Sequence, residues 1–284
     1  MRLLNVFNAF MLSLLLTACV VEAQPTMPPP TLVLYNWPGY VPQSILDAFT
    51  AETGIQIIYE AYANQEEAME QLRAGREVDI AVLDNTYVPM AAAEGLLSEL
   101  NYANIPNFHY ISPSFRDLAF DPGNRYSITL QWGTTGLIVR TDRIEDPVTS
   151  WNDLWDPRYA GKIGIWPYGR EMVSVALKSL NYSLNSEDPA ELAEAEKKLL
   201  SLRQNVFLID PAMPTAESYL IEDEAVMVYG WTYDAREAQT KLAATTYILP
   251  EEGTILWFDN LVIPASSNHK AAAEQFIDFL FRPE

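Results

Sequence analysis

The sequence predicts an α/β protein built of two lobes. Short apolar runs rich in β-branched residues alternate with amphipathic helical segments, and this alternation begins twice along the chain. Near its end the chain adds one more strand and helix that return to the first series. The 284 residues, 49% of them hydrophobic and 20% charged, are ample for a buried core and suggest one large domain or two modest ones.

The first series contains three strands and two helices. Each strand is short, β-branched and bounded by turn residues, and the three are Leu32–Asn36, Ile55–Tyr59 and Val78–Leu83. The first helix, within PQSILDAFTAETG, has Pro42 near its start and Gly54 just past its end. The second, within NQEEAMEQLRAG, closes at Gly75. This βαβαβ order predicts a parallel sheet.

The chain passes from the first series of elements to the second near residues 133–139. The elements of the second series are strand Lys162–Ile165, helix Glu171–Leu180, helix Pro189–Leu202, a short strand Phe207–Ile209 and strand Ala225–Tyr229. The chain then returns through strand Thr245–Leu249 and the extended segment TILWFDNLVIP to a last helix, Lys270–Phe281. We therefore assign residues 32–136 and 259–284 to lobe 1 and residues 137–258 to lobe 2.

The first residues are typical of an export signal. MRLLNVFNAFMLSLLLTAC has Arg2 before an apolar run that is short for a membrane span and ends in small residues. Its end, LTAC, resembles the bacterial lipobox, which implies a signal peptide over residues 1–18, a lipid on Cys19 and a proline-rich tether over residues 19–31. The alternative is an ordinary thiol in a cleaved peptide. Cys19 is the only cysteine, so neither a disulfide nor a thiolate metal site is expected.

The charge of the chain narrows the class of partner. The formal net charge is −20, from 38 acidic and 18 basic residues, and it would repel phosphate-rich molecules. Nucleic acid is therefore not an expected partner. The acidic surface has two interpretations. It can serve solubility, as in many proteins, or it can attract a cationic ligand.

Aromatic and acidic residues stand together in two segments. The strand Leu32–Asn36 stops in a loop with Trp37 and Tyr40, and loops at strand ends are common binding positions. In TILWFDNLVIP alternate side chains share a face, so Trp257 and Asp259 point the same way. A ring beside a carboxylate suits an alkylammonium, through a cation–π contact and a charge-assisted hydrogen bond. The alternatives are a core position for Trp257 and a turn cap for Asp259.

The motifs NWPGY, SWNDLWDPRYAGKI, GRE, YGW, WFDNLVIP and FLFRP occur in the order found in a known family. Over residues 31–284 the sequence resembles the spermidine/putrescine-binding proteins that deliver polyamines to ABC transporters. The resemblance implies a type II periplasmic-binding-protein-like fold, in which two α/β lobes joined by crossing strands close over a ligand in the cleft between them. Members of the family usually continue beyond FLFRP into a segment that adds ligand contacts. Without those contacts, the two lobes are expected to close less firmly over the ligand.

The resemblance also implies which residues contact the ligand, with acids at the amines and rings along the methylenes. The residues at the family's binding positions are Trp37, Tyr40, Glu171, Trp231, Asp234, Trp257 and Asp259. For Asp234 the alternative role is a favourable interaction with a helix N-terminus. Arg170 is expected to pair at the surface or to brace the Glu171 carboxylate.

The sequence departs from the family at three of these positions. Tyr168 replaces an Asp that often precedes the Glu of the RE motif by three residues, which puts one amine contact in doubt. Asp84 stands where many members carry Ser, so an acid is expected to have moved across the cleft. Pro38 replaces a polar residue. Asp84 is therefore a candidate ligand contact, and the secondary candidates are Pro38, Asn85, Tyr87 and Tyr168.

Other functions fit the residues less well. A ferric-ion binder of the same fold would use clustered tyrosines with an acid or His, but the 15 Tyr include no Tyr-Tyr pair, and His109 and His269 resemble surface or packing residues. An anion binder would need basic residues at helix N-termini. A hydrolase would need a motif such as Gly-x-Ser-x-Gly, which we do not find, and paired acids for glycoside hydrolysis are a weak signal in so acidic a chain.

We therefore expect a monomeric, exported binding protein that is not an enzyme and holds no cofactor or metal. The expected partners are a polyamine ligand, an ABC-transporter permease and, through lipidated Cys19, the membrane. The protein would face the periplasm or the extracellular side. A lipid-anchored amine sensor is the other alternative, alongside the ferric-ion binder.

Overall fold

The computed structural model of the protein describes residues 30–210 and 215–283. The predicted signal peptide, the predicted lipid site Cys19 and nearly all of the predicted tether lie outside the described residues. In the part of the chain that is described, no helix has the length and apolar character needed to cross a membrane.

Nine strands in the described residues form one hydrogen-bonded sheet. In chain order they are β1 (Thr31–Asn36), β2 (Gln56–Ala61), β3 (Ile80–Asp84), β4 (Ser127–Arg140), β5 (Ile163–Ile165), β6 (Val206–Leu208), β7 (Met227–Trp231), β8 (Thr245–Ile248) and β9 (Leu256–Val262). Their order in space is β2-β1-β3-β9-β4-β7-β5-β6, and β8 also pairs with β4. As predicted, β1, β2 and β3 are parallel, whereas β9 is antiparallel to both β3 and β4.

Eight α-helices, counted over the same residues, connect these strands. They are α1 (Gln43–Thr53), α2 (Gln65–Arg73), α3 (Val88–Ala93), α4 (Gly169–Ser179), α5 (Pro189–Leu202), α6 (Ala216–Ile221), α7 (Thr232–Lys241) and α8 (Lys270–Leu280). The predicted bounds of α5 are confirmed at both ends. At its N-terminus, Asp188 caps the helix by accepting a hydrogen bond from the backbone N–H of Ala190. The short helices α3 and α6 were not predicted.

Two strands begin two residues later than predicted: β3, predicted at 78–83, also ends one residue later, and β7, predicted at 225–229, ends two residues later. Trp231 is consequently the last residue of β7, opposite Thr135 of β4, whereas the sequence placed it after the strand. Val78 and Ala225, each two residues before one of these strands, are buried without belonging to the ladder. The apolar run in the sequence therefore predicts which residues are buried, and it does not predict where the hydrogen-bonded strand begins and ends.

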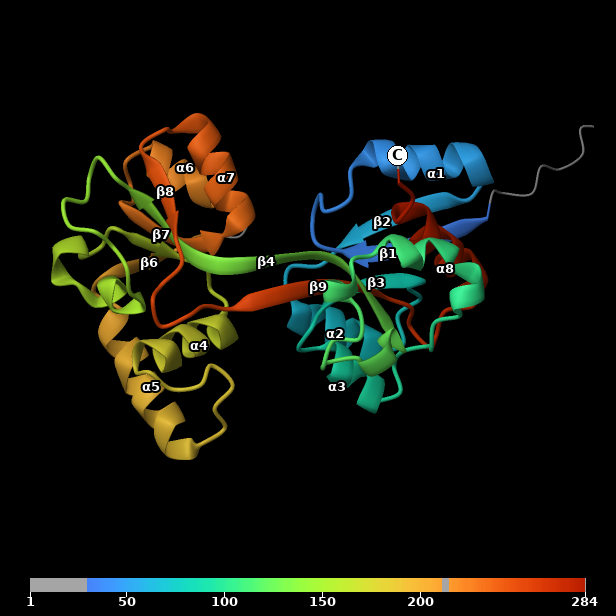
Figure 1. Ribbon diagram of the computed structural model, residues 1–284, viewed down its shortest axis with the longest axis horizontal. Coiled ribbons are helices and arrows are strands. Elements are labelled where there is room, and N and C mark those ends of the chain that lie inside the picture. The colour runs from blue at the N-terminus through green and yellow to red at the C-terminus, as the bar shows by residue number, and fades with distance from the viewer. Residues whose placement is uncertain (1–29, 211–214, 284) are drawn as a thin grey trace, which may run out of the picture.

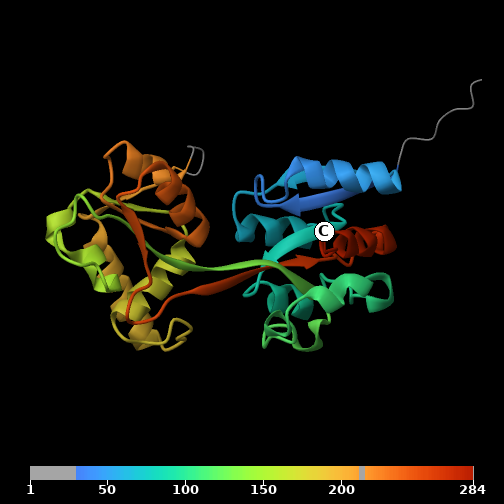
Figure 2. The same cartoon turned by 45° about the horizontal axis from the view of Figure 1, so that its top comes forward.

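The elements gather into two lobes that β4 and β9 connect (Figures 1 and 2). Lobe 1 contains β1–β3 with α1, α2, α3 and α8, and lobe 2 contains β5–β8 with α4–α7. Over residues 127–134 β4 pairs with β9, and over residues 135–140 it pairs with β7 and β8. The two crossing strands agree with the expected architecture, and the division at residues 136/137 and 258/259 stays a prediction.

Each lobe has an apolar core of its own. In lobe 1, Phe49 of α1 packs edge-on against Phe276 of α8 with ring centroids 4.9 Å apart, and both rings are fully buried. In lobe 2, Trp151 packs beside Tyr229 of β7 at 6.1 Å. Separate cores allow each lobe to keep its shape while the connecting strands bend, which is the arrangement required for hinge closure.

Candidate functional site

The candidate site lies where β3 and β9 run side by side in lobe 1. The antiparallel register places Asp84, the last residue of β3, directly opposite Asp259 of β9, and Asp259 is opposite Gln131 of β4 on its other side. Residues opposite each other in an antiparallel pair have neighbouring side chains. Two carboxylates that are 175 positions apart in the sequence are thus brought together by this pairing.

Asp259 is nearly inaccessible to water, with 7% of its surface exposed. Burial raises the pKa of this carboxyl to about 6, and the charge of Asp84 acts in the same direction, while hydrogen bonding from Tyr40 and Trp37 lowers it. The Tyr40 hydroxyl donates a short hydrogen bond to Asp259 Oδ2. The carboxylate is therefore oriented by the aromatic loop that carries Trp37 and Tyr40.

The loop after β1 is fixed by tyrosines. The backbone N–H of Tyr40 donates to the Tyr59 hydroxyl at 3.1 Å, and that hydroxyl donates to the Trp37 carbonyl. The Trp37 ring meets Tyr62 edge-on with centroids 4.7 Å apart. The structure thus holds Trp37 and Tyr40 beside Asp259, whereas Pro38 between them is exposed.

Asp84 and Asn85 have partly local roles. Asp84 Oδ1 accepts hydrogen bonds from the backbone N–H of Thr86, at 2.8 Å, and from the Thr86 hydroxyl. Burial raises the pKa of Asp84. Asn85 binds the edge of β9 twice, because its backbone N–H donates to the Phe258 carbonyl at 2.8 Å and its Oδ1 accepts from the Phe258 N–H at 3.1 Å.

Lobe 2 contributes Glu171 from the first turn of α4. Glu171 Oε2 accepts a hydrogen bond from the Tyr229 hydroxyl of β7. Burial raises the pKa of Glu171 to about 7, and the charges of Asp84 and Asp259 contribute to this rise. Because both of those acids belong to lobe 1, carboxylates of one lobe influence the pKa of a carboxyl of the other.

Three rings of lobe 2 form an aromatic cluster beside Glu171. Trp231 stacks on Trp166 with centroids 5.6 Å apart and lies 5.9 Å from Tyr168. Sequence reasoning did not single out Trp166. Its signal was available, because Trp166 directly follows β5 just as Trp37 directly follows β1. Tyr168 thus adds a ring to this cluster at the position where the family resemblance implies an acid.

Asp234 and Trp257 each have a structural contact in addition to the binding role predicted for them. Asp234 accepts the Trp231 backbone N–H at 3.2 Å, so it does interact with the N-terminus of α7, yet burial raises the pKa of its carboxyl to about 6 and the charge of Glu217 adds to the rise. Trp257 lies against Gly133, where a Cβ would be 2.3 Å from its Cζ2. Only a glycine at position 133 leaves room for this ring.

Arg170 has neither of its two expected roles. Its guanidinium carbon lies 5.4 Å from the ring centroid of Tyr87 in lobe 1. Tyr87 in turn donates a 2.6 Å hydrogen bond to Glu66. A surface pair or a contact with the Glu171 carboxylate was expected, and the sequence gave no sign of a contact between the lobes. Within residues 30–210 and 215–283, no group of His, Asp and Glu residues could hold a metal ion.

Comparisons with known proteins show what the chain is similar to. Residues 44–284 match the family of bacterial extracellular solute-binding proteins. The chain is 37% identical over 261 residues to the spermidine/putrescine-binding periplasmic protein of Salmonella typhimurium, covering 89% of this chain and 73% of the relative. It is 36% identical, with the same coverage, to the Escherichia coli protein of that name.

Two solved structures show the same architecture. The spermidine/putrescine ABC transporter substrate-binding protein of Streptococcus pneumoniae is 33% identical with a TM-score of 0.75, over 89% of this chain and 78% of the other. A lipoprotein of Treponema pallidum is 25% identical with a TM-score of 0.82, over 89% and 81%. The predicted periplasmic-binding-protein-like fold and the family resemblance are confirmed.

Three of the carboxyls give the ligand-free protein a defined pH dependence. The pKa values of Asp234 and Asp259 are raised to about 6 and that of Glu171 to about 7. In the unfolded chain such groups ionise at about pH 4. The folded state therefore binds more protons between these values, and the stability associated with these groups is present below about pH 4 and lost as the pH rises through about 6 to 7.

We predict that Glu171→Gln gains stability relative to the unchanged protein, by about 1 to 3 kcal/mol, between about pH 5 and about pH 7.5. The reason is that the variant has no buried carboxylate to ionise. Denaturant unfolding of both ligand-free proteins at the two pH values measures the difference. Glu251→Gln, on an exposed turn, is the control and should show no such gain. A Glu171→Gln effect that is equal at both pH values would contradict the prediction.

Proposed function

The chain belongs to the bacterial extracellular solute-binding protein family, and on this premise we propose that it captures polyamines such as putrescine and spermidine for uptake by an ABC transporter. The observation that carries the proposal is that Asp84 and Asp259 lie opposite each other on β3 and β9 in lobe 1, close enough to Glu171 of lobe 2 for their charges to raise its pKa. Acids contributed by both lobes match a ligand with a positive charge at each end.

The aromatic residues complete the match to a polyamine. Trp37 and Tyr40 lie near Asp259 on lobe 1, and Tyr168 lies near Glu171 on lobe 2 with Trp231 beside it. Rings can contact methylene groups through their apolar faces and ammonium groups through cation–π attraction, each such contact contributing about 0.5 to 2 kcal/mol. An alkyl chain with terminal ammonium groups presents both kinds of surface.

The mechanism we infer is capture by lobe closure. In the ligand-free protein the carboxylates of the two lobes repel one another, which opposes closure. A polyamine between them replaces this repulsion with attraction on both sides, so it binds the closed form more tightly and shifts the population toward it. Tyr40 and Tyr229 keep the carboxylates Asp259 and Glu171 oriented before the ligand arrives.

The alternative functions have no comparable support. The tyrosine hydroxyls nearest the acids, those of Tyr40 and Tyr229, donate hydrogen bonds to carboxylates, which differs from the free phenolate ligands that a ferric-ion binder would need. An amine sensor would bind its ligand in the same way as a transport protein. Its closed form would then contact a signalling partner instead of a permease. We propose a binding role without catalysis, because the named relatives are solute-binding proteins.

We further propose that the protein is exported and anchored by a lipid on Cys19, and that it acts as a monomer that presents its closed form to a permease. Two observations support the anchor: the LTAC sequence at the end of the apolar run, and the likeness to a lipoprotein of Treponema pallidum. The relatives of Salmonella and Escherichia coli are named as periplasmic proteins, which fits an exported protein.

Titration calorimetry with putrescine, spermidine and spermine tests the proposed ligand class. We expect saturable binding of at least one linear polyamine, and weaker binding at higher salt, because attraction between acids and ammonium groups in a partly open cleft is screened. Arginine, a neutral sugar and citrate serve as comparison ligands. Tighter binding of any of these three than of every polyamine would refute the proposal.

A second prediction ranks two residues of β9. Asp259→Asn should cost about 2 to 5 kcal/mol of polyamine affinity, because it leaves a desolvated ammonium without its partner charge. Trp257→Ala removes a ring contact worth about 0.5 to 2 kcal/mol. Calorimetry of both variants should therefore show the larger loss for Asp259→Asn. Unchanged affinity in Asp259→Asn would mean that the cleft is assigned wrongly.

The anchor gives a separate prediction about location. Cys19→Ser should move the protein from the membrane fraction to the soluble fraction, since a lipidated cysteine is the only anchor that we propose. Immunoblotting of membrane and soluble fractions from cells that produce the full chain measures this, with the unchanged chain as control. Complete sedimentation of Cys19→Ser with membranes would show that the lipobox interpretation is incorrect.

A further inference from the structure

Lobe 2 contains a buried acid that the proposed binding mechanism does not use. Glu217 lies in the first turn of α6 and has 2% of its surface exposed. Its Oε1 accepts a 2.8 Å hydrogen bond from Nζ of Lys241, in the last turn of α7. Its Oε2 is buried and has no hydrogen-bond partner among the residues that the structure describes. A buried carboxylate oxygen without a donor is unfavourable, which suggests that a donor comes from outside the protein.

A comparable acid in lobe 1 has a purely structural role. Glu274 of α8 is 1% exposed and, like Glu217, pairs with a lysine, Lys270. Both of its oxygens have further donors, because Oε1 accepts from the Asn101 N–H at 2.8 Å and Oε2 accepts from the Asn104 side chain at 2.7 Å. Glu274 thereby connects α8 to a neighbouring segment. No such connection accounts for the second oxygen of Glu217 within the described residues.

Glu217 lies near Asp234, on the side of the cleft. Asp234 is in the first turn of α7, and α7 is on the side of lobe 2 that faces lobe 1 (Figure 1). Helix α6 packs against α7. Asp234 is 7% exposed; burial raises its pKa, and the charge of Glu217 adds to the rise. Two buried carboxylates therefore lie close together, and Lys241 pairs with only one of them.

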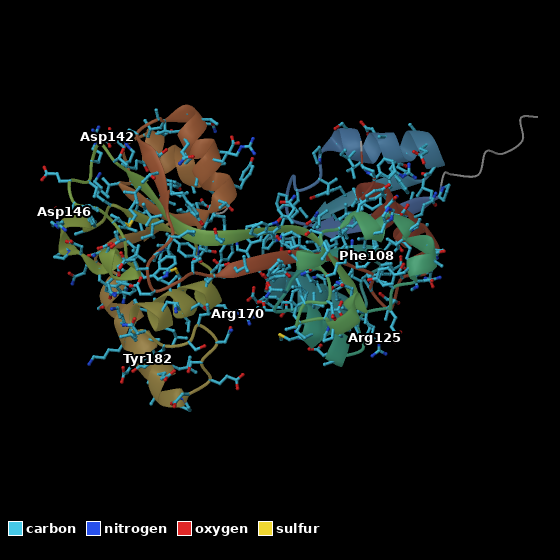
Figure 3. All side chains as sticks on the ribbon, in the orientation of Figure 1. Phe108, Arg125, Asp142, Asp146, Arg170 and Tyr182 are labelled. Carbon is cyan, nitrogen blue, oxygen red and sulfur yellow. The ribbon has the colours of Figure 1, made fainter. Side chains whose placement is uncertain are left out.

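Aromatic rings connect these two acids with Glu171. That residue is next to Arg170, which Figure 3 labels on the side of lobe 2 that faces lobe 1. Burial raises the pKa of Tyr168, and the charges of Glu171 and Asp234 add to the rise, so Tyr168 lies near both carboxylates. The Trp231 ring is 5.9 Å from that of Tyr168, between centroids. Acids separated by rings suit ammonium groups that are separated by methylenes.

We propose that Glu217 and Asp234 form a second ammonium-binding site in lobe 2, which takes the additional amine of a linear triamine. This inference rests on the proposed polyamine-binding function. A diamine needs one acid on each lobe, which Asp259 and Glu171 supply. The additional ammonium of a triamine supplies the donor that Glu217 Oε2 lacks. Lys241 already holds the other oxygen, so its charge opposes the entry of the ligand's ammonium.

Titration calorimetry of putrescine and spermidine tests this site with two substitutions of opposite expected effect. Glu217→Gln should weaken spermidine binding by about tenfold or more, because a charge-assisted hydrogen bond is lost, and should change putrescine affinity by less than about twofold. Lys241→Met should strengthen spermidine binding by about threefold or more, because an opposing cation is removed. Lys241→Met decides the question alone should Glu217→Gln fail to fold, which thermal melts would reveal.

The Lys270–Glu274 pair supplies matched controls. Glu274→Gln and Lys270→Met make the same changes in charge at a buried pair of lobe 1, and neither should change the ratio of spermidine to putrescine affinity. A constant ratio in the lobe 2 variants, or equal shifts in the controls, overturns the inference while leaving polyamine binding intact. An unchanged protein that binds neither amine refutes the proposed function itself.

Discussion

The structure depends on keeping several like-charged carboxyls close together in a cleft with little water. Burial alone makes this unfavourable, and it raises the pKa of Asp259, Glu171 and Asp234. Tyrosine hydroxyls offset part of the cost, because Tyr40 donates to Asp259 and Tyr229 donates to Glu171. The cationic ligand that we propose would relieve the remaining unfavourable energy. On that proposal, the cost of burying these carboxyls and the affinity for a cation have the same origin.

Strand β9 determines where these groups stand. It lies between β3 and β4, so its register places Asp259 opposite Asp84 and places Trp257 opposite Gly133. The ring of Trp257 can lie there because position 133 has no side chain. Strand β9, which is distant in sequence from both of its neighbours, therefore sets the positions of Asp259 and Trp257 together. The same strand is one of the two that connect the lobes.

The sequence predicted the features that depend on local pattern. Alternating strands and helices indicated the parallel half of lobe 1, and the period of two in WFDN indicated that Trp257 and Asp259 share a face. Features that depend on contacts between distant segments were missed. Tyr229 is a core residue by sequence, and only the packing of α4 on β7 brings its hydroxyl to Glu171. Arg170 was assigned a local pair, because a contact with Tyr87 exists only when both lobes are in place. The individual binding roles, inferred from family positions, are still predictions.

The two strands that cross between the lobes have a mechanical consequence. Over residues 127–134 of β4 they are bound to each other by a ladder of backbone hydrogen bonds, and β4 alone continues into lobe 2 in the same strand. A ribbon of two paired strands bends readily out of its own plane and twists, but sliding one strand along the other would break the ladder. The lobes can therefore approach by rotation, whereas translation of one lobe past the other is resisted. Such a linkage has few degrees of freedom, so the closure that we propose would bring the same surfaces together in the same orientation each time.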